Sequence, residues 1–167
     1  MIVFDASTLI LIAKIDLLEV SLRGIGMEAA IPQAVEAECC GARKSYDSLT
    51  IRKALDDSRI KIIPAKDRKL VAKLRDDFSL GKGECEAIAV ALREKASLVG
   101  IDDREGINAC KLIGIPFTTA IAILVRSYEK RLLGQSEALA MLTALAKHAW
   151  YRTSFLDDAR RRLEEPL

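Results

Sequence analysis

The stretch Ile2-Val3-Phe4-Asp5-Ala6-Ser7-Thr8 opens the chain with a short apolar run that ends at a carboxylate. Its β-branched and aromatic residues are typical of a strand, which places the acid at the strand's carboxyl end. Three more acidic pairs stand at the edges of ordered segments: Glu36 and Glu38 after Ile31-Pro32, Glu84 and Glu86 after Gly81-Lys82-Gly83, and Asp102 and Asp103 after Ser97-Leu98-Val99-Gly100-Ile101. Carboxylates are costly to gather unless a positive charge holds them together. Since Mg²⁺ and Mn²⁺ prefer oxygen ligands, the pattern predicts a metal-dependent enzyme.

The composition fits one globular domain. The chain has 167 residues, of which 50% are hydrophobic, enough to build a core without disulfides or a structural metal. A net charge of +2 does not by itself indicate a nucleic-acid-binding protein. Basic residues cluster locally, and their ordinary interpretation is a solvated helix face. The clusters are Arg43/Lys44, Lys66 to Lys73, Arg126 to Arg131 and Arg160 to Arg162.

The cysteines and the single histidine argue against a zinc site. No C-x-x-C pair occurs, and His148 has no partner at ligand spacing. Buried, reduced thiols in the cytoplasm are the expected state of the four cysteines. Asp5 interrupts the first apolar run and no basic segment precedes it, so no secretory signal is expected. No apolar stretch reaches membrane-spanning length, and we expect a soluble cytoplasmic protein without membrane contact. The cysteines are Cys39, Cys40, Cys85 and Cys110.

Short strands and amphipathic helices alternate as far as about residue 118, which predicts a parallel sheet with helical crossovers. Strands are expected at residues 2–4, 59–64, 98–101 and 115–117. Helices are expected at residues 9–20, 31–41, 46–58, 66–78, 83–95 and 104–112. Three further helices, at residues 121–133, 136–148 and 154–165, follow without any strand. The simplest organisation is one domain with a helical C-terminus.

In a parallel α/β sheet, functional groups collect at the carboxyl ends of the strands. Asp5 and the pair Asp102 and Asp103 each follow a strand, so they share an edge if those strands are parallel neighbours. Glu38 lies three residues after Val35, on the same face of its helix. The alternative for any single acidic cluster is surface decoration or helix capping.

The acids within a pair are expected to diverge. Glu84 and Glu86 are separated by about 200° of helical rotation, so one can face a metal while the other binds an amide or a cation. Of the adjacent Asp102 and Asp103, one is expected to cap the following helix. The sequence leaves open which member of each pair is the direct ligand.

Four segments resemble, in order and spacing, the acidic motifs of PIN-domain ribonucleases, in the prokaryotic branch related to VapC-like toxins. They are V-F-D-A-S-T-L-I, I-P-Q-A-V-E-A-E, G-K-G-E-C-E-A-I-A-V-A and V-G-I-D-D-R. The resemblance covers residues 2 to about 125, and four motifs in order are far more specific than one. It implies an α/β fold, the PIN-like three-layer α/β/α architecture with a mostly parallel sheet and a helical C-terminal extension. Residues 1–125 would form the catalytic core, and residues 126–167 the extension packed on the same domain.

The resemblance also implies a role for each acid. The four catalytic acids would be Asp5, Glu38, Glu86 and Asp103, with Asp5, Glu86 and Asp103 holding the metal. Accessory positions would be Ser7, Glu84 and Asp102. The chain departs from the branch at Asn108, where an arginine is usual, and at residues 119–122, where the branch carries a glycine-rich segment. These departures concern substrate handling and partner docking rather than metal binding.

The implied reaction is hydrolysis of RNA phosphodiester bonds, in which Mg²⁺ or Mn²⁺ lowers the pKa of a bound water. Lys82, Arg104 and the pair Arg43/Lys44 are candidates for phosphate contacts, and solvent-exposed charge is the alternative for each. Aromatic residues make up only 5% of the chain, so no base-stacking platform is evident.

Relationship to VapC-like toxins implies a small antitoxin protein as partner and a homodimer. The apolar helices of residues 9–20 and 139–150 could serve such interfaces, although we favour burial of these stripes in the chain's own core. Another alternative is a catalytically silent PIN-fold module that binds RNA or protein. A haloacid-dehalogenase-like phosphatase is disfavoured, because Ser7 stands where that chemistry needs a second aspartate.

Overall fold

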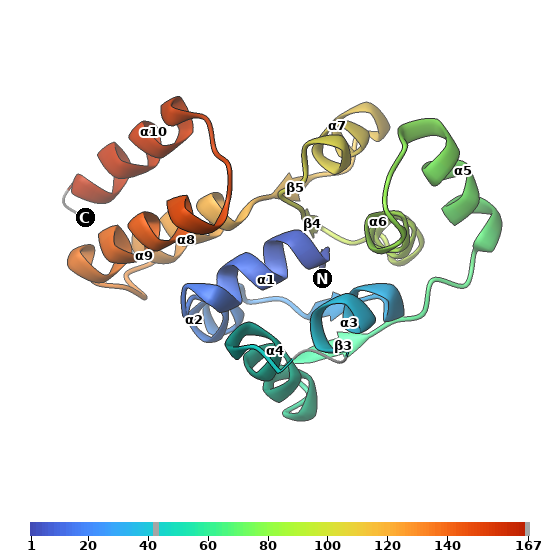
Figure 1. Ribbon diagram of the computed structural model, residues 1–167, viewed down its shortest axis with the longest axis horizontal. Helices are drawn as coiled ribbons and strands as arrows, with labels where there is room; N and C mark the ends of the chain where they lie inside the picture. Colours follow the sequence, from blue (N-terminus) through green and yellow to red (C-terminus); the bar gives the residue numbers. More distant parts are fainter. Residues whose placement is uncertain (42–43, 166–167) are drawn as a thin grey trace.

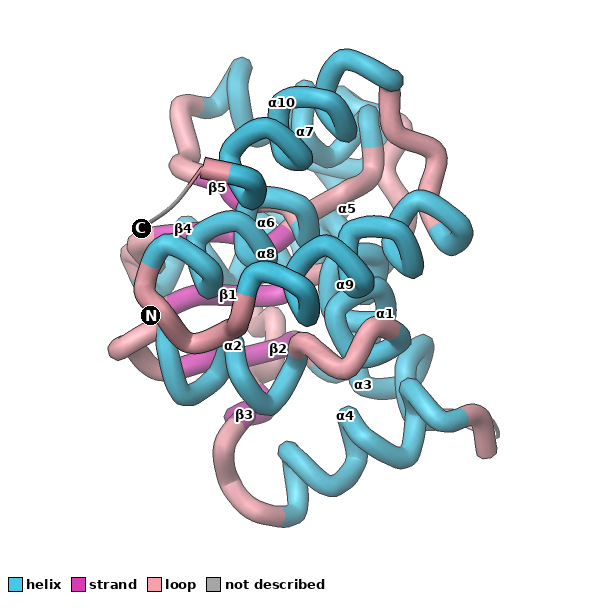
Figure 2. The backbone as a smooth tube through the Cα atoms, turned by 90° about the vertical axis from the view of Figure 1, so that its left-hand side faces the viewer, coloured by secondary structure: helices cyan, strands magenta, loops and turns pink. Residues whose placement is uncertain are grey.

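A five-stranded parallel sheet lies at the centre of the protein, in a computed structural model that describes residues 1–41 and 44–165. The strands are β1 (Ile2–Phe4), β2 (Ala29–Ile31), β3 (Ile60–Ile62), β4 (Leu98–Gly100) and β5 (Phe117–Thr118). They lie in the order β3-β2-β1-β4-β5, and every pairing is parallel (Figure 2). Successive strands are added on one side of β1 and then on the other, so helical crossovers cover both faces.

Helices surround the sheet on both faces, which confirms the predicted three-layer α/β/α architecture. The helices α1, α2 and α8 to α10 lie on one side of the sheet, and α5 to α7 on the other (Figure 1). The helix α3 packs against both α4 and α6 at the sheet's margin. Their bounds are α1 (Ala6–Lys14), α2 (Leu18–Gly24), α3 (Gln33–Cys40), α4 (Tyr46–Asp56), α5 (Arg68–Phe78), α6 (Lys82–Glu94), α7 (Arg104–Ile113), α8 (Ala120–Glu129), α9 (Gln135–His148) and α10 (Thr153–Glu164).

Side chains of β1 alternate between two hydrophobic cores. Ile2 and Phe4 pack with α1, α2, α8 and α9, whereas Val3 packs with α5, α6 and α7 on the opposite face. A strand buried on both faces reads as a continuous apolar run, which is why residues 2–4 were recognisable from the sequence. The four cysteines are free and buried within these cores.

The strand β2 was not predicted, because Ile31-Pro32 was expected to start a helix. Its sequence Ala-Ala-Ile carries little strand propensity, since alanine favours helices. The strand forms because β1 and β3 pair with it on either side, for example at Ala29 with Ile2 and Ile60. Tertiary pairing therefore overrides local preference here.

The single helix predicted over residues 9–20 is wrong, because the chain breaks between α1 and α2. Asp16 adopts a left-handed conformation with φ of 60°. The N–H of Leu17 then donates to the carbonyl of Ile12 at 2.9 Å, and the N–H of Asp16 to Ala13 at 3.3 Å. This is the hydrogen-bond pattern of a Schellman termination, which usually has glycine at the left-handed position. Aspartate tolerates it, and so the break was invisible to a search for glycine.

The C-terminal helices join the core of one face rather than standing apart. Leu142 and Leu145 of α9 and Leu163 of α10 are buried in the same cluster as Phe4. The predicted division between residues 1–125 and 126–167 stays a prediction, and its boundary falls within α8. Over residues 1–41 and 44–165, no helix is long and apolar enough to cross a membrane.

Candidate active site

Asp5 lies at the carboxyl end of β1 and is only 3% exposed. It caps α1, and its Oδ2 accepts the N–H of Ser7 at 3.1 Å and the hydroxyl of Ser7 at 2.7 Å. Ser7 Oγ in turn accepts the N–H of Asp102 at 3.0 Å. The ends of β1 and β4 are therefore fastened together at the point where the strand order reverses, which is where α/β sheets form their clefts.

The adjacent Asp102 and Asp103 point to different partners. Asp102 Oδ2 accepts the Thr8 hydroxyl at 2.7 Å and the N–H of Ala120, at the start of α8, at 2.8 Å. Asp102 Oδ1 accepts the hydroxyl of Tyr151, from the segment between α9 and α10. Asp103 is exposed and caps α7, where its Oδ1 accepts two N–H groups of the first turn at 2.8 and 3.4 Å. Asp102 thus ties elements together, and Asp103 lies at the open edge.

Glu84 and Glu86 also separate. Glu84 Oε2 accepts the N–H of Gly81 at 2.7 Å, and Glu84 Oε1 is buried without a hydrogen-bond partner among the described residues. Glu86 Oε2 accepts the N–H of Ala34 at 3.0 Å, in the first turn of α3, and Glu86 Oε1 lies 4.0 Å from Lys82 Nζ. The N-cap residue of α3 is Pro32, whose side chain cannot accept a hydrogen bond. The carboxylate of Glu86, on α6, caps α3 instead.

Two glycines leave room for the acids. A methyl group on Gly83 would lie 2.6 Å from Glu38 Oε1, and one on Gly106 would lie 2.2 Å from Ile101 Cδ1 and 2.9 Å from Glu84 Oε1. Cβ atoms do not approach other atoms so closely in proteins, so a larger residue at either position would displace these side chains. Glu38 on α3 therefore lies against Gly83, in the first turn of α6.

Three of the acids lie close enough for their charges to interact. Burial raises the pKa of Asp5, and the charge of Asp103 raises it further, against the hydrogen bonds from Ser7. Burial likewise raises the pKa of Glu84 to about 7, with further increases from Asp103 and Asp5 and a decrease from the Gly81 N–H. Asp5, Glu84 and Asp103 therefore repel one another across a short distance, as acids do when a cation is their natural counter-charge.

The carboxylate oxygens of these acids suit a divalent cation, although they do not form a closed cage. Within the described part of the chain, no three acidic, cysteine or histidine side chains already surround one point. Mg²⁺ keeps several waters and needs only one or two direct carboxylates, so a closed cage is not required. Glu84 Oε1 is a buried, unpartnered hard oxygen, Asp103 is exposed beside it, and Glu38 is exposed against the neighbouring Gly83. These residues fit a metal site.

A family model described as a PIN domain matches residues 1–165. The chain belongs to the PIN-domain family. PIN domains are generally nucleases that use divalent metal ions, and PIN nucleases bind RNA. A comparison with curated proteins finds no match. The PIN-domain resemblance recognised from the four motifs is confirmed, while the relationship to VapC-like toxins stays a prediction.

The basic residues predicted to contact phosphate lie near the PIN-domain acids. Lys82 occupies the first turn of α6 with its side chain 77% exposed, and Arg104 begins α7 directly after Asp103. Lys44 is exposed, and Arg43 lies outside the described residues. Two cationic side chains thus flank the acidic edge of the sheet.

Several residues that contact the acids or leave room for them were not predicted from the sequence. Gly83 and Gly106 could have been suspected, because glycine inside a helix costs about 1 kcal/mol and is often kept for close approach. Thr8 follows Ser7 in the first motif and was considered only a weak candidate. Tyr151 had no local signal at all, since its partner Asp102 is 49 positions away.

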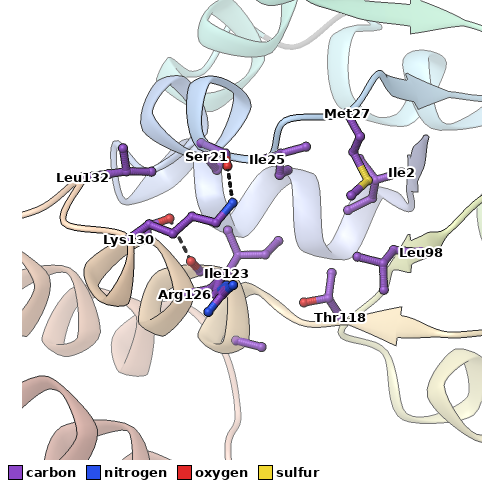
Figure 3. A pocket seen from close by; sticks show the side chains of 13 residues that line it. Ile2, Ser21, Ile25, Met27, Leu98, Thr118, Ile123, Arg126, Lys130 and Leu132 are labelled. Carbon is purple, nitrogen blue, oxygen red and sulfur yellow. Dashed lines mark hydrogen bonds between the residues drawn. The ribbon is translucent and has the colours of Figure 1, made fainter.

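A pocket of about 260 Å³ lies between α2, α8 and the first residues of β1 and β4, away from the acids. Ile2, Met27 and Leu98 form its apolar wall (Figure 3). Lys130 crosses one side to donate to the carbonyl of Gly24 at 2.6 Å. None of the four motif acids lines it. The pocket therefore lies where helices pack on the sheet, apart from the acidic edge.

Replacing Tyr151 by phenylalanine tests the link between the C-terminal helices and Asp102. The loss of a hydrogen bond to a largely buried carboxylate should lower the free energy of unfolding by about 1.5–3 kcal/mol. Thermal denaturation should then show a Tm lower by about 3–12 °C. The matched control is Tyr46→Phe, which removes a hydrogen bond to Asp16 between two exposed side chains and should change stability by less than about 0.5 kcal/mol. Equal Tm values for the two variants would contradict the assignment.

The raised pKa of Glu84 predicts a pH-dependent effect of Glu84→Gln in chelator-treated protein. Because the folded pKa of about 7 lies above the ordinary 4.5, the folded protein holds the proton more tightly than the unfolded chain. The stability linked to that proton is present below pH 4.5 and is lost as the pH rises through about 7. The Tm of Glu84→Gln relative to wild type should therefore increase between about pH 5 and about pH 8. A Tm difference between Glu84→Gln and wild type that stays constant over this pH range would contradict the raised pKa of Glu84.

Proposed function

We propose that this PIN-domain protein is a Mg²⁺- or Mn²⁺-dependent endoribonuclease that hydrolyses RNA phosphodiester bonds. The observation that carries the proposal is the unpartnered, buried Glu84 Oε1 beside the charges of Asp5 and Asp103. A structural role for Glu84 would provide both of its oxygens with hydrogen-bond donors, as the chain does for Asp102. The buried Oε1 has none among the described residues, and such an oxygen is suited to a cation.

The residues that would hold the cation are Asp5, Glu84 and Asp103, with Glu38 completing the set from α3. We assign the third acid to Glu84 in place of Glu86, because the charges of Asp5 and Asp103 act on Glu84, whereas Glu86 caps α3 and its other oxygen lies 4.0 Å from Lys82 Nζ. A bound divalent cation supplies a water of lowered pKa and neutralises charge on the scissile phosphate.

The chain's own groups prepare this chemistry. Ser7 directs one oxygen of Asp5 and leaves the other available. Because the pKa of Glu84 is raised to about 7, its carboxyl is partly protonated near neutral pH in the cation-free protein and would lose that proton as a ligand, so cation affinity should rise with pH. Lys82 and Arg104 are proposed to bind the RNA phosphates that flank the cleaved bond.

A toxin role, a small antitoxin partner and a homodimer stay predictions. The apolar stripes considered as interfaces are largely buried within the chain, since Leu9, Ile12 and Leu17 are 0% exposed and Leu145 is equally buried. Helix amphipathicity therefore serves the core here, as the sequence analysis favoured, and it supplies no support for a protein partner.

Cleavage of a mixed RNA panel tests the nuclease proposal. Wild-type protein should cut with Mg²⁺ or Mn²⁺ and not with chelator, and Asp5→Asn should lower the rate on the order of 100-fold or more. The matched control is Asp57→Asn, an exposed acid at the end of α4 near the opposite edge of the sheet, which should cut normally. Equal cutting by wild type and Asp5→Asn would refute the site. RNA binding without cutting would favour the catalytically silent alternative.

The third-acid assignment is tested by comparing Glu84→Gln with Glu86→Gln. At a Mn²⁺ concentration about a hundred times Kd, binding should stabilise the wild-type protein by about 2.7 kcal/mol, measured through the rise in Tm. The stabilisation of Glu84→Gln should be much smaller. Glu86→Gln should keep that rise but start from a stability lower by about 0.5–2 kcal/mol, because α3 loses its cap. The reverse pattern would return the third position to Glu86.

A further inference from the structure

The pocket of about 260 Å³ between α2, α8 and the sheet lies at the amino ends of β1 and β4. Ile2 and Leu98, the first residues of these two strands, form part of its wall. Protein interiors contain few voids larger than a water molecule. This pocket has room for roughly eight to ten non-hydrogen atoms, since a water molecule takes up about 30 Å³ in the liquid. It is therefore large enough for a small organic molecule.

The inner part of the pocket offers few polar contacts. Ile2 and Ile123 are buried there, together with Ser21 and Ser127. The Ser21 hydroxyl donates to the carbonyl of Leu18 at 2.8 Å, and the Ser127 hydroxyl donates to the carbonyl of Ile123 at 2.8 Å. Each hydroxyl proton is used within its own helix, so neither serine has a donor left for a bound anion. A hydrocarbon body suits this part of the pocket.

Two cations lie at the opening of the pocket. Arg126 of α8 and Lys130, which follows the last residue of α8, are exposed and line it. Figure 3 shows both side chains on the side away from Ile2 and Leu98. The Lys130 ammonium donates to the carbonyl of Gly24 at 2.6 Å, which holds it beside the pocket and leaves its other protons free. The opening therefore presents positioned donors.

Carboxylates of the chain do not cancel this positive charge. None of the described residues that line the pocket is acidic. Glu129 accepts a hydrogen bond from Arg126 at 3.3 Å, and it also accepts one from Arg162. A carboxylate shared by two arginines leaves net positive charge, and Lys130 adds to it. An anionic group at the opening would therefore meet complementary charge.

We propose that this pocket binds a medium-chain monocarboxylate, with its hydrocarbon chain inside and its carboxylate between Arg126 and Lys130. A nucleotide would place polar ribose and base groups against the apolar wall without hydrogen-bond partners, which is costly. The site lies at the amino ends of the strands, whereas Asp5 and Asp103 follow their carboxyl ends. The proposal therefore does not rest on the nuclease function.

Methionine methyl groups give a readout inside the pocket, because the chain has 3 methionines and Met27 lines the pocket. Met141, on α9, is buried in the core and serves as an internal reference. The probe is octanoate, which has about ten non-hydrogen atoms, and ligands of that size bind with Kd in roughly the micromolar to millimolar range. In methyl-labelled wild-type protein, octanoate up to about 10 mM should move the Met27 resonance saturably and leave that of Met141 in place.

Comparison of charged and uncharged partners tests the carboxylate. Octan-1-ol should bind about 3- to 30-fold more weakly than octanoate, since it brings no charge to the two cations. Arg126→Gln should weaken octanoate binding about 2- to 10-fold and leave octan-1-ol binding unchanged. The matched control is Arg162→Gln, which removes a hydrogen bond to the same Glu129 from outside the pocket. It should change octanoate binding by less than about 2-fold.

Filling the pocket tests its position. Ala122 is exposed and lines the pocket, so Ala122→Phe should place a ring in it and abolish octanoate binding while Tm stays close to the wild-type value. Absence of a saturable Met27 shift in wild type up to about 10 mM octanoate, or binding that persists in Ala122→Phe, would overturn the site. Equal affinities for octanoate and octan-1-ol, or equal losses in Arg126→Gln and Arg162→Gln, would overturn its preference for an anion.

Discussion

The carboxylate of Asp5 is buried at the carboxyl end of β1, and the surrounding structure follows from how that burial is compensated. Its cost falls when Ser7 donates both its N–H and its hydroxyl to one carboxylate oxygen. The same hydroxyl accepts the N–H of Asp102, so one small side chain joins the β1–α1 and β4–α7 junctions. Because β1 and β4 are paired in register from Ile2 to Phe4, the first and last acidic motifs meet at this edge.

Glu84 and Asp103 lie close enough to Asp5 for the three charges to interact. Glycine at position 83 leaves room for the Glu38 carboxylate, and glycine at position 106 leaves room for Ile101 and for Glu84 Oε1. Asp103 and Glu38 stay at the surface, where water screens their charge. Burial, together with the charges of Asp103 and Asp5, raises the pKa of Glu84 to about 7. A fold that needed these acids only for stability would gain by replacing Glu84 with an apolar residue.

The sequence predicted the order of most elements and the gathering of acids at one edge, and it failed where tertiary contacts overrule local preference. β2 has the sequence Ala-Ala-Ile, with little strand propensity of its own, and forms because its neighbours pair with it. At the end of α1, Asp16 takes the left-handed position where glycine is expected. The choice between Glu84 and Glu86 could not be made from spacing, because a helix fixes only the angle between them. It depends on which side α3 packs, since the N-terminus of α3 attracts whichever carboxylate faces it.

Adjacency explains why Asp102 and Asp103 divide their tasks. Consecutive side chains leaving a strand point to opposite sides, so one turns inward and the other stays at the edge. The inward Asp102 binds the first N–H of α8 and the hydroxyl of Tyr151 beyond α9. The C-terminal helices are thereby attached to the peptide unit that also carries Asp103. The C-terminal helices, which supply none of the four acids, are thus hydrogen-bonded to the residue before Asp103 and help to hold the strand end from which Asp103 leaves.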